Sequence, residues 1–557
     1  MTAKLGIFSA NVKTIAGVLD DAAKWAMAKI EHNCKRAVLG IEKHFHATVI
    51  ACLVLSFFFR FFLIIPNPVT SDRLIYVAKA IEIMNGDFRP LVTHEIGWPM
   101  AIAAFSLLTG KSGTSSVGFV SDVASVIFSA LTVLPVALAA RSIFNTRVAS
   151  VAAVFSAFWS SMDTAPGLSE GLFMFLLALS FYFIVRSRDS WKWMFLANAA
   201  IGYAATMKIN GIVLPLVLFV GFAFSRRQRL TMKDLAHFLV STIPFVVIVV
   251  PNWLARNEAF GSMFFYGANS NLFIDGGTSA MWAPNMTYMP SIIDYLKTHD
   301  IIAIADRFVV GGIARVALRF FTSAIPAVLI VAFAAGALRN IMSRKRYVVL
   351  FIAAILLPNA LVYDAFSPTR YLVIVIPVAM ILSASGLVSL LKRVKFQNKH
   401  TLACTVGCVI VCMLLYSGVR GTNVVTSPYA RNVAITVEAR STWIEWGIAN
   451  LQNTTLMTEE GYADMIVSSF GDPEPMHSAS GIYFRSSSAN ISLMFAVYFD
   501  QIDDAYSWIT AHGVTHYIDM QSNRDIPWAG QISADPRFVA VHSFTGVYES
   551  ITIYAVA

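Results

Sequence analysis

Carboxylates stand at the start of apolar stretches in this chain of 557 residues. Asp72 follows Ser71 and precedes apolar residues at helical spacing, which are Leu74, Val77, Ala78, Ile81 and Met84. Such a carboxylate can act as a general base on a hydroxyl group within hydrogen-bonding reach. A Ser or Asp at this place is equally well explained as a helix N-cap without further function. Asp72 is therefore a candidate catalytic residue with a structural alternative.

Two further acidic positions lie beside apolar segments. Glu170 follows Ser169 where an apolar stretch begins, and a carboxylate there is costly unless it is paired or faces water. His94 and Glu95 precede Gly97-Trp98-Pro99 and offer an imidazole and a carboxylate to a metal ion or a phosphate. Two adjacent polar residues are a weak metal signal, so the identity of any metal stays unknown.

Three cations complete the set of candidates. Lys208 lies in Lys-Ile-Asn-Gly, Arg256 precedes Asn257, and Arg370 precedes Tyr371. Each of them alone is explained as an ordinary anchor at a membrane interface. Three such cations beside carboxylates indicate an anion site, and a phosphate is the natural ligand for Lys and Arg.

Helices in a lipid bilayer would position these residues. Hydrophobic residues make up 57% of the chain and charged residues 13%, whereas soluble proteins carry about 25% charged residues. A crossing helix needs about 20 apolar residues, and about eleven segments qualify. They are residues 47–65, 119–140, 149–161, 168–185, 193–206, 212–224, 236–254, 316–338, 348–362, 372–391 and 402–419. The sequence predicts an α-helical polytopic membrane protein, with an amphipathic segment over 1–46 and a transmembrane domain over 47–419.

The loops predict the sidedness of these spans. Short basic connections alternate with connections that are mixed in sign or nearly uncharged; the basic set is 141–147, 186–192, 226–233, 344–346 and 392–399. Lys and Arg collect in cytoplasmic loops, so this set and the N-terminus are predicted to be cytoplasmic. The net charge of +9 is then a topology signal, and a nucleic-acid partner is not expected. Long loops over 67–118 and 255–314 fall outside the membrane, together with every candidate residue above.

Residues 420–557 have the composition of a small α/β domain on the same outer side. Helical patterns cover 441–451 and 503–512, an apolar run covers 455–457, and a strand pattern covers 515–520. Residues 538–544 and 546–555 alternate with a period of two and predict a hairpin. No cysteine follows Cys412, so we expect this domain to be stabilised by its own core.

Short motifs recur along the chain in one order. They are Ser71-Asp72, Gly86-Asp87, Gly97-Trp98-Pro99, Ser169-Glu170, Thr206-Met-Lys208, Trp253-Leu-Ala-Arg256-Asn257 and Arg370-Tyr371-Leu372. The ordered set resembles the membrane-embedded glycosyltransferases of the GT-C class, most closely the protein O-mannosyltransferase and aminoarabinose transferase branch. The resemblance covers most of residues 47–391, and each motif alone is weak.

The resemblance implies an inverting enzyme that moves a sugar from a polyprenyl-phosphate donor to a lipid, glycan or protein acceptor outside the cytoplasmic membrane. Asp72 matches the family's general base, and Glu170 matches its second acidic position, a contact for the acceptor or a metal. His94 and Glu95 are tentative members of that acceptor or metal set. The residues implied for the donor phosphate are Lys208, Arg256, Arg370 and Tyr371. The resemblance fixes no cofactor and leaves room for a divalent metal ion.

Two departures and three alternatives stay open. Arg73 stands where many relatives carry a second acidic or a small residue, and Thr93-His94-Glu95 replaces the Glu-Lys-Pro of the aminoarabinose branch. A polymerase or ligase of lipid-linked glycans would share the topology. A transporter or flippase of glycolipid predicts functional charges near mid-membrane, whereas the candidates lie at span ends. A structural or sensory protein with an outer domain is the third alternative.

Overall fold

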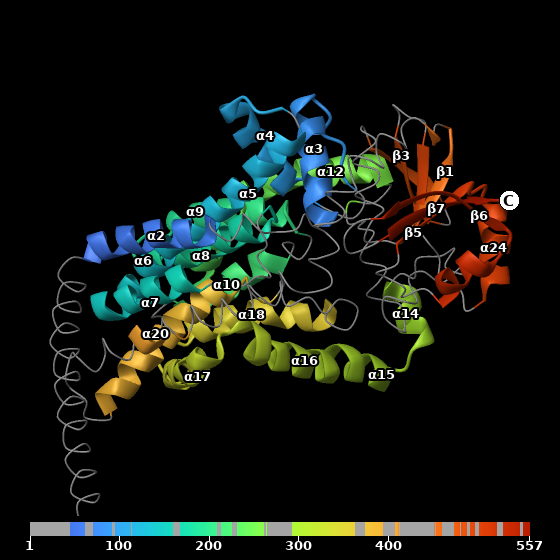
Figure 1. Cartoon of the computed structure of the whole chain (residues 1–557). Coiled ribbons are helices and arrows are strands. Elements are labelled where there is room, and N and C mark those ends of the chain that lie inside the picture. Colours follow the sequence, from blue (N-terminus) through green and yellow to red (C-terminus); the bar gives the residue numbers. More distant parts are fainter. Residues whose placement is uncertain are drawn as a thin grey trace, which may run out of the picture.

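The structure, a computed structural model, consists of a helical part and a sheet domain (Figure 1). It describes residues 45–61, 71–91, 95–112, 114–159, 167–208, 213–225, 231–260, 263, 292–362, 372, 374–393, 407–409, 412, 450–451, 453–458, 473–478, 481–486, 491–495, 501–520, 527–545 and 550–557. Residues 1–44 and the predicted span 402–419, apart from four of its residues, lie outside this set.

The helical part contains α-helices with two π-helical turns between them. The helices are α2 (Phe45–Phe61), α3 (Ser71–Met84), α4 (Gly97–Thr109), α5 (Thr114–Leu131), α6 (Val133–Ile143), α7 (Thr146–Phe158), α8 (Glu170–Arg186), α9 (Trp193–Ala205), α10 (Leu214–Ser225), α11 (Met232–Ser241), α12 (Ile243–Phe260), α14 (Ile292–Thr298), α15 (Ile301–Ala305), α16 (Gly312–Arg319), α17 (Ala327–Ile341), α18 (Tyr347–Val362) and α20 (Ile376–Arg393). The π-helical turns are η3 (Asp306–Gly311) and η4 (Phe320–Ala324).

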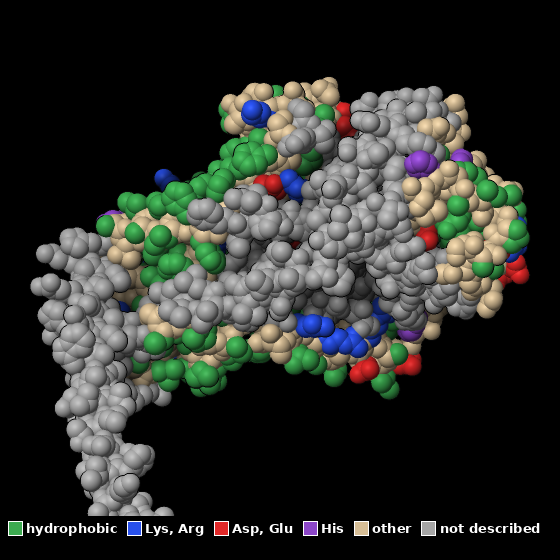
Figure 2. All heavy atoms as spheres, viewed as in Figure 1, with side chains coloured by type: hydrophobic (Ala, Val, Ile, Leu, Met, Phe, Trp, Pro, Cys, Tyr) green, Lys and Arg blue, Asp and Glu red, His purple; other side chains and the backbone are tan. Residues whose placement is uncertain are grey.

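Apolar side chains cover the flanks of this bundle (Figure 2). Ile50, Phe58 and Leu216 are among the large hydrophobic residues that are more than half exposed. By length and apolarity, one described helix, Ser116–Ile143, is able to cross a membrane. The helices Met232–Ser241 and Ile243–Glu258, which are bent by 41° relative to each other, make a second candidate if they form one span. Eight more apolar helices have 10–17 residues. The count of eleven spans therefore stays a prediction.

Most predicted spans coincide with observed helices, and the main departure is at Pro326. The predicted span over 316–338 is interrupted, because Ile325 is extended (φ −85°, ψ 131°) between η4 and α17. A proline disfavours the helical conformation of the residue before it, which explains the break. The outer loops also contain more structure than expected, since α4 lies in loop 67–118 and α14 and α15 lie in loop 255–314.

The basic connections gather at one end of the bundle, where their cations lie over aromatic rings. The pairs are Arg141 with Phe45, Lys345 with Phe144, Arg188 with Tyr347 and Arg346 with Phe224, at 4.8, 4.1, 4.3 and 5.2 Å from the ring centroid. Such contacts are favourable because the ring face carries partial negative charge. These contacts join the ends of α6, α8 and α10 to the starts of α2 and α18. Because basic and less basic loops alternate along the chain, the sequence predicts that these helix ends lie on the same side. Which side of a membrane this end faces stays a prediction.

Close packing of α17 on α20 depends on two glycines. A Cβ atom on Gly386 would lie deep inside the van der Waals radius of the Ala332 carbonyl oxygen, and one on Gly336 would meet that of Leu382. Small residues allow two helix backbones to approach in this way, and membrane proteins use them widely.

We expect Gly386→Ala to lower the thermal unfolding midpoint of the full chain in detergent. The added methyl group must push the two backbones apart, and overpacking of this kind costs about 1–3 kcal/mol. Gly530→Ala is the matched control, because a Cβ there meets nothing within 4 Å. Equal midpoints for the two variants would contradict this account of the helix pair.

The C-terminal domain is built on a seven-stranded mixed sheet of order β2-β3-β4-β1-β5-β7-β6. The strands are β1 (Thr455–Thr458), β2 (Pro473–Ser478), β3 (Gly481–Ser486), β4 (Ile491–Phe495), β5 (His516–Met520), β6 (Phe538–Thr545) and β7 (Ser550–Val556). Strand β1 pairs in parallel with β4 and β5, and the other neighbours are antiparallel.

The sheet packs against helix α24 (Ile502–Ala511) and the 3-10 helix η5 (Pro527–Ala534). Trp528, Tyr517 and Ile509 are completely or almost completely buried in this core. The predicted helix over 503–512, the strand over 515–520 and the final hairpin are confirmed. The strands β2 to β4 were not predicted, and the helical pattern over 441–451 lies almost wholly outside the described residues.

Candidate functional site

A buried ion pair lies at the end of the bundle opposite the basic connections. Lys208, which follows α9, donates from Nζ to Oε1 of Glu170 over 2.7 Å. Glu170 is the first residue of α8, and the exposed fractions of the two side chains are 12% for Lys208 and 2% for Glu170. The positive end of the helix dipole favours a carboxylate there, and Lys208 supplies the partner that a carboxylate in an apolar setting requires. The structure thus joins two of the predicted site residues.

Gly97 and Trp98 hold both halves of this pair in place from the start of α4. The amide of Gly97 donates to the carbonyl oxygen of Thr206 over 2.6 Å, shortly before Lys208. The indole Nε1 of Trp98, which is fully buried, donates to the carbonyl oxygen of Gly167 over 2.9 Å, shortly before Glu170. A Cβ on Gly97 would collide with Thr206, so only glycine allows this approach. The Gly-Trp motif is therefore an anchor for the site.

We expect Trp98→Phe to destabilise the chain by about 1–3 kcal/mol, because the variant loses a buried hydrogen bond and leaves unfilled space. Trp193→Phe is a suitable control, because Trp193 is half-buried at the opposite end and its ring face, over which Arg186 lies, is retained. Thermal unfolding of both variants measures the difference, and equal midpoints would contradict the anchoring role.

A second ion pair fixes the first turn of α3. Arg73 donates from Nη2 to Oδ2 of Asp122 in α5 over 2.6 Å, and both side chains are largely buried. The pair packs against Gly167, whose φ of +86° favours glycine and where a Cβ would lie 2.7 Å from atoms of both partners. Arg73, which departs from the family pattern, thus has a structural partner of its own. Arg73 follows Asp72 directly in the chain, so this pair ties the start of α3 to α5.

A third cluster joins Glu95 to α12. Asn252 donates from Nδ2 to Oε2 of Glu95 over 2.8 Å, and Nη1 of Arg256 lies 3.6 Å from the same oxygen. Arg256 also donates from Nη1 to the carbonyl oxygen of Leu91 over 3.1 Å. Arg256 is 1% exposed and Glu95 is 4% exposed, so the pair is a buried element of the loop that leads into α4. Arg256 as a phosphate ligand stays a prediction.

Asp72 is the second residue of α3, as the sequence predicts for the start of this helix. Of the predicted apolar face of α3, Val77 is buried and Ile81 and Met84 pack partly buried against the core. The helix ends at Met84, and Gly86 follows it with a φ of +93°. Hydrogen bonds from Arg89 hold the pKa of the following Asp87 at about 2. Asp72 is therefore at the start of α3, and the ion-paired carboxylate of Asp87 follows the end of the same helix.

Several predicted residues lie outside the described part of the chain. His94, Arg370 and Tyr371 are among them, so their predicted roles are untested. Within the described residues, no group of three or more His, Cys, Asp or Glu side chains comes together as a metal site.

Arg60, which stands inside the apolar stretch over 47–65, has several hydrogen-bond partners. Its guanidinium donates to Ser56 within α2 and to the carbonyl oxygens of Ser156, Ala157 and Trp159, the last over 2.6 Å. These carbonyl groups are the unsatisfied acceptors at the end of α7. Arg60 therefore acts as a C-terminal cap for that helix.

Sequence reasoning missed the partners Asp122 and Asn252, and it missed the cations of α16. Figure 2 shows Lys and Arg side chains gathered over α16, which contains Arg315 and Arg319. No motif marks Asp122 or Asn252, since each lies inside an apolar stretch. A polar residue within such a stretch is costly unless paired, and that rule was the available signal.

Comparisons with known proteins bear on the same region. A family model described as dolichyl-phosphate-mannose-protein mannosyltransferase matches residues 94–254. The matched stretch includes Glu95, Trp98, Glu170, Lys208 and Asn252. The comparison with curated proteins finds no significant match.

Solved structures show a similar fold over most of the chain. An Archaeoglobus fulgidus oligosaccharyltransferase tethered with an acceptor peptide matches with a TM-score of 0.56 at 12% identity, covering 93% of this chain and 74% of that one. ArnT from Cupriavidus metallidurans bound to undecaprenyl phosphate matches with 0.51 at 14% identity, covering 91% and 97%. AglB from Archaeoglobus fulgidus, in complex with an inhibitory peptide and a dolichol-phosphate, matches with 0.51 at 14% identity, covering 86% and 69%. At these identities the likeness establishes the fold.

Proposed function

We propose that the chain is a membrane glycosyltransferase of the GT-C class, which transfers a sugar from a polyprenyl-phosphate donor to an acceptor outside the cytoplasmic membrane. One observation carries the proposal. The residues matched by the mannosyltransferase family model, 94–254, contain the Glu170–Lys208 ion pair, the Trp98 side chain that donates to the segment before Glu170, and the hydrogen bond from Asn252 to Glu95. The solved relatives that bind dolichol-phosphate or undecaprenyl phosphate support the donor class.

The reaction starts at the acceptor hydroxyl group, with Asp72 as the general base. As the hydroxyl oxygen attacks the anomeric carbon of the sugar, its proton passes to the Asp72 carboxylate. The bond from the anomeric carbon to the phosphate oxygen breaks on the opposite face, so the configuration inverts. A correctly placed base of this kind contributes about 10²–10⁴-fold to the rate.

The leaving polyprenyl phosphate gains negative charge as this bond breaks. Lys208, Arg370 and Tyr371 are the proposed groups that stabilise it, with Arg256 beside them, because preorganised cations lower the energy of developing charge. Lys208 is held by Glu170 over 2.7 Å, which orients its ammonium group before the donor arrives. The polyprenyl chain lies along the apolar flanks of the helices while its phosphate reaches the polar end.

In Figure 1 the C-terminal sheet domain is seen beyond the end of α12. In the proposed orientation this domain is extracytoplasmic and the basic connections are cytoplasmic. The acceptor is a lipid, a glycan or a protein.

The test is transfer by the purified full chain in proteoliposomes. Labelled sugars on undecaprenyl phosphate are supplied with extracts of envelope glycans, lipids and proteins, and the labelled product is identified by mass spectrometry. A product that requires the chain supports the proposal, and a matching residue should be missing from a deletion strain. Movement of labelled lipid across the bilayer without a covalent product would instead support a flippase.

We expect Lys208→Gln to weaken donor binding more than acceptor binding. The variant leaves Glu170 buried without its cation, so the double variant Lys208→Gln/Glu170→Gln separates lost phosphate binding from lost stability. Lys111→Gln, at an exposed position after α4, is the control for charge alone. Donor and acceptor dissociation constants are compared for all three, and equal losses for donor and acceptor would remove Lys208 from the donor site.

A further inference from the structure

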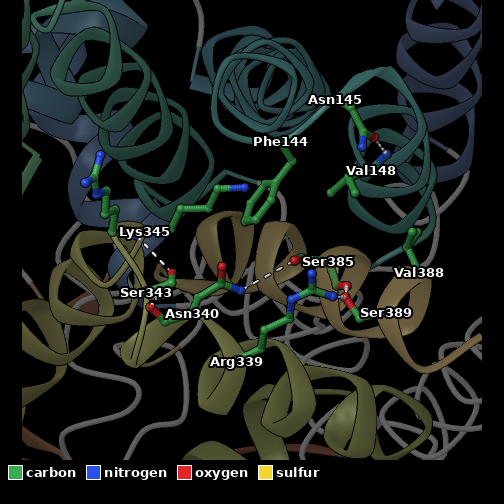
Figure 3. A pocket seen from close by; sticks show the side chains of 11 residues that line it. Phe144, Asn145, Val148, Arg339, Asn340, Ser343, Lys345, Ser385, Val388 and Ser389 are labelled. Atoms are coloured by element: carbon green, nitrogen blue, oxygen red, sulfur yellow. Dashed lines mark hydrogen bonds between the residues drawn. The ribbon is translucent and has the colours of Figure 1, made fainter. Parts of the chain in front are cut away.

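A cavity of about 340 Å³ opens at the end of the bundle that carries the basic connections (Figure 3). Phe144 and Asn145 line it from the turn between α6 and α7. Arg339 and Asn340 line it from the last turn of α17, and Ser385 and Ser389 line it from α20. Glu170 and Lys208 lie at the other ends of α8 and α9, so this cavity is separate from the proposed catalytic site.

All the charged residues that line this cavity are cations. Arg339, Arg344 and Lys345 line it, no carboxylate does, and none of the three forms an ion pair with a carboxylate in the described part of the chain. Burial, and to a smaller extent the nearby Arg339 and Arg188, lowers the pKa of Lys345. An anion in the cavity would relieve the repulsion between these cations.

Neutral donors and a helix terminus add to the attraction for an anion. Asn340 donates from Nδ2 to Oγ of Ser385 over 3.4 Å, and Arg339 donates to Oγ of Ser389, so the polar groups of α17 and α20 converge in the cavity (Figure 3). Helix α7 begins here, with Asn145 as its N-cap, and helix N-termini carry partial positive charge. Arg matches a phosphate through parallel hydrogen bonds.

Apolar side chains beside the cavity indicate where such a phosphate would come from. Leu338, Ile341 and Met342, the neighbours of Arg339 and Asn340, are 72%, 44% and 90% exposed. Exposed apolar surface of this kind next to a cationic pocket fits a molecule with a phosphate head and an apolar tail. Basic pockets between helices at the cytoplasmic face bind anionic head groups.

We propose that this cavity binds the phosphate of an anionic phospholipid, with the acyl chains lying along Leu338, Ile341 and Met342 of the α17 end. A soluble phosphate shares the head-group chemistry but gains nothing from the exposed apolar surface. The site is thus a lipid site at the predicted cytoplasmic face, separate from the donor site at the opposite end.

Native mass spectrometry of the full chain in detergent tests the assignment. Phosphatidylglycerol and phosphatidylcholine with identical acyl chains are titrated separately, and inorganic phosphate is titrated as the soluble arm. We expect phosphatidylglycerol to bind about tenfold or more tightly than phosphatidylcholine, and Arg339→Gln/Lys345→Gln to remove that preference. Lys192→Gln, an exposed cation of another basic connection, should retain it.

A second variant removes the cavity without removing charge. Ser389→Phe places a ring in the space and should also abolish the preference for phosphatidylglycerol. Equal affinity of the wild-type chain for the two lipids would overturn the proposal, as would an unchanged preference in the double-charge variant. Competition by inorganic phosphate, with no advantage for either lipid, would assign the cavity to a soluble phosphate and overturn the lipid assignment.

Discussion

Asp72→Asn is expected to reduce sugar transfer by about 10²–10⁴-fold, the range that a general base contributes. A carboxamide has nearly the same shape as a carboxylate but does not accept the acceptor's proton. Asp72 lies in the first turn of α3, where a negative charge interacts with the helix dipole by about 0.3–1 kcal/mol. The thermal unfolding midpoint should therefore change little while the rate collapses. Initial rates in proteoliposomes, with donor and acceptor saturating, measure the effect.

This variant also separates catalysis from the structural alternative. Asn has the shape of Asp and gives up only the interaction of its charge with the helix dipole, about 0.3–1 kcal/mol, so a purely structural Asp72 predicts an Asn variant of nearly full activity. The control is Asp87→Asn at the other end of α3, where Arg89 hydrogen-bonds the carboxylate. Asp87→Asn should retain transfer. Full activity of Asp72→Asn, or equal losses in both variants, would remove Asp72 from the mechanism.

Local patterns predicted the elements that depend on neighbouring residues. Helix α3 was predicted from its apolar spacing and its Ser-Asp start, and α24 and the final hairpin from their periodicities. Gly86 of the Gly86-Asp87 motif, with a φ of +93°, follows the end of α3. In each case a residue's own conformational preference and the burial of one face point to the same structure.

Pairings over long sequence distances were beyond such patterns. Glu95 and Asn252 are 157 residues apart, and Arg73 and Asp122 are 49 residues apart. The sequence spacing of these residues does not identify their partners, because only the folded bundle brings the two members of each pair together. The same reason explains the missed strands β2 to β4, whose partners set their register.

The buried pair of Arg256 and Glu95 gives the largest expected effect on stability. We expect Arg256→Met to destabilise the chain by about 3–5 kcal/mol, because it leaves a buried carboxylate without its cation. Asn252 remains hydrogen-bonded to that carboxylate but brings no charge. Glu95→Leu should destabilise comparably for the opposite reason, since the buried Arg256 would lose the carboxylate beside it. Denaturant unfolding of the full chain in mixed micelles measures both.

The double variant Arg256→Met/Glu95→Leu then separates a structural from a functional cation. Replacing a buried ion pair with apolar groups of similar size is often neutral or stabilising, so stability should return towards the wild-type value. If Arg256 also contributes to the electrostatic field at the leaving phosphate, donor affinity should stay weakened in the double variant. The positive charge of Arg256 is absent from both the single and the double variant. Affinity for undecaprenyl phosphate, measured in the same micelles, gives the answer. Recovery of affinity together with stability would make Arg256 a support for the loop before α4 and would leave the phosphate to Lys208 and Arg370.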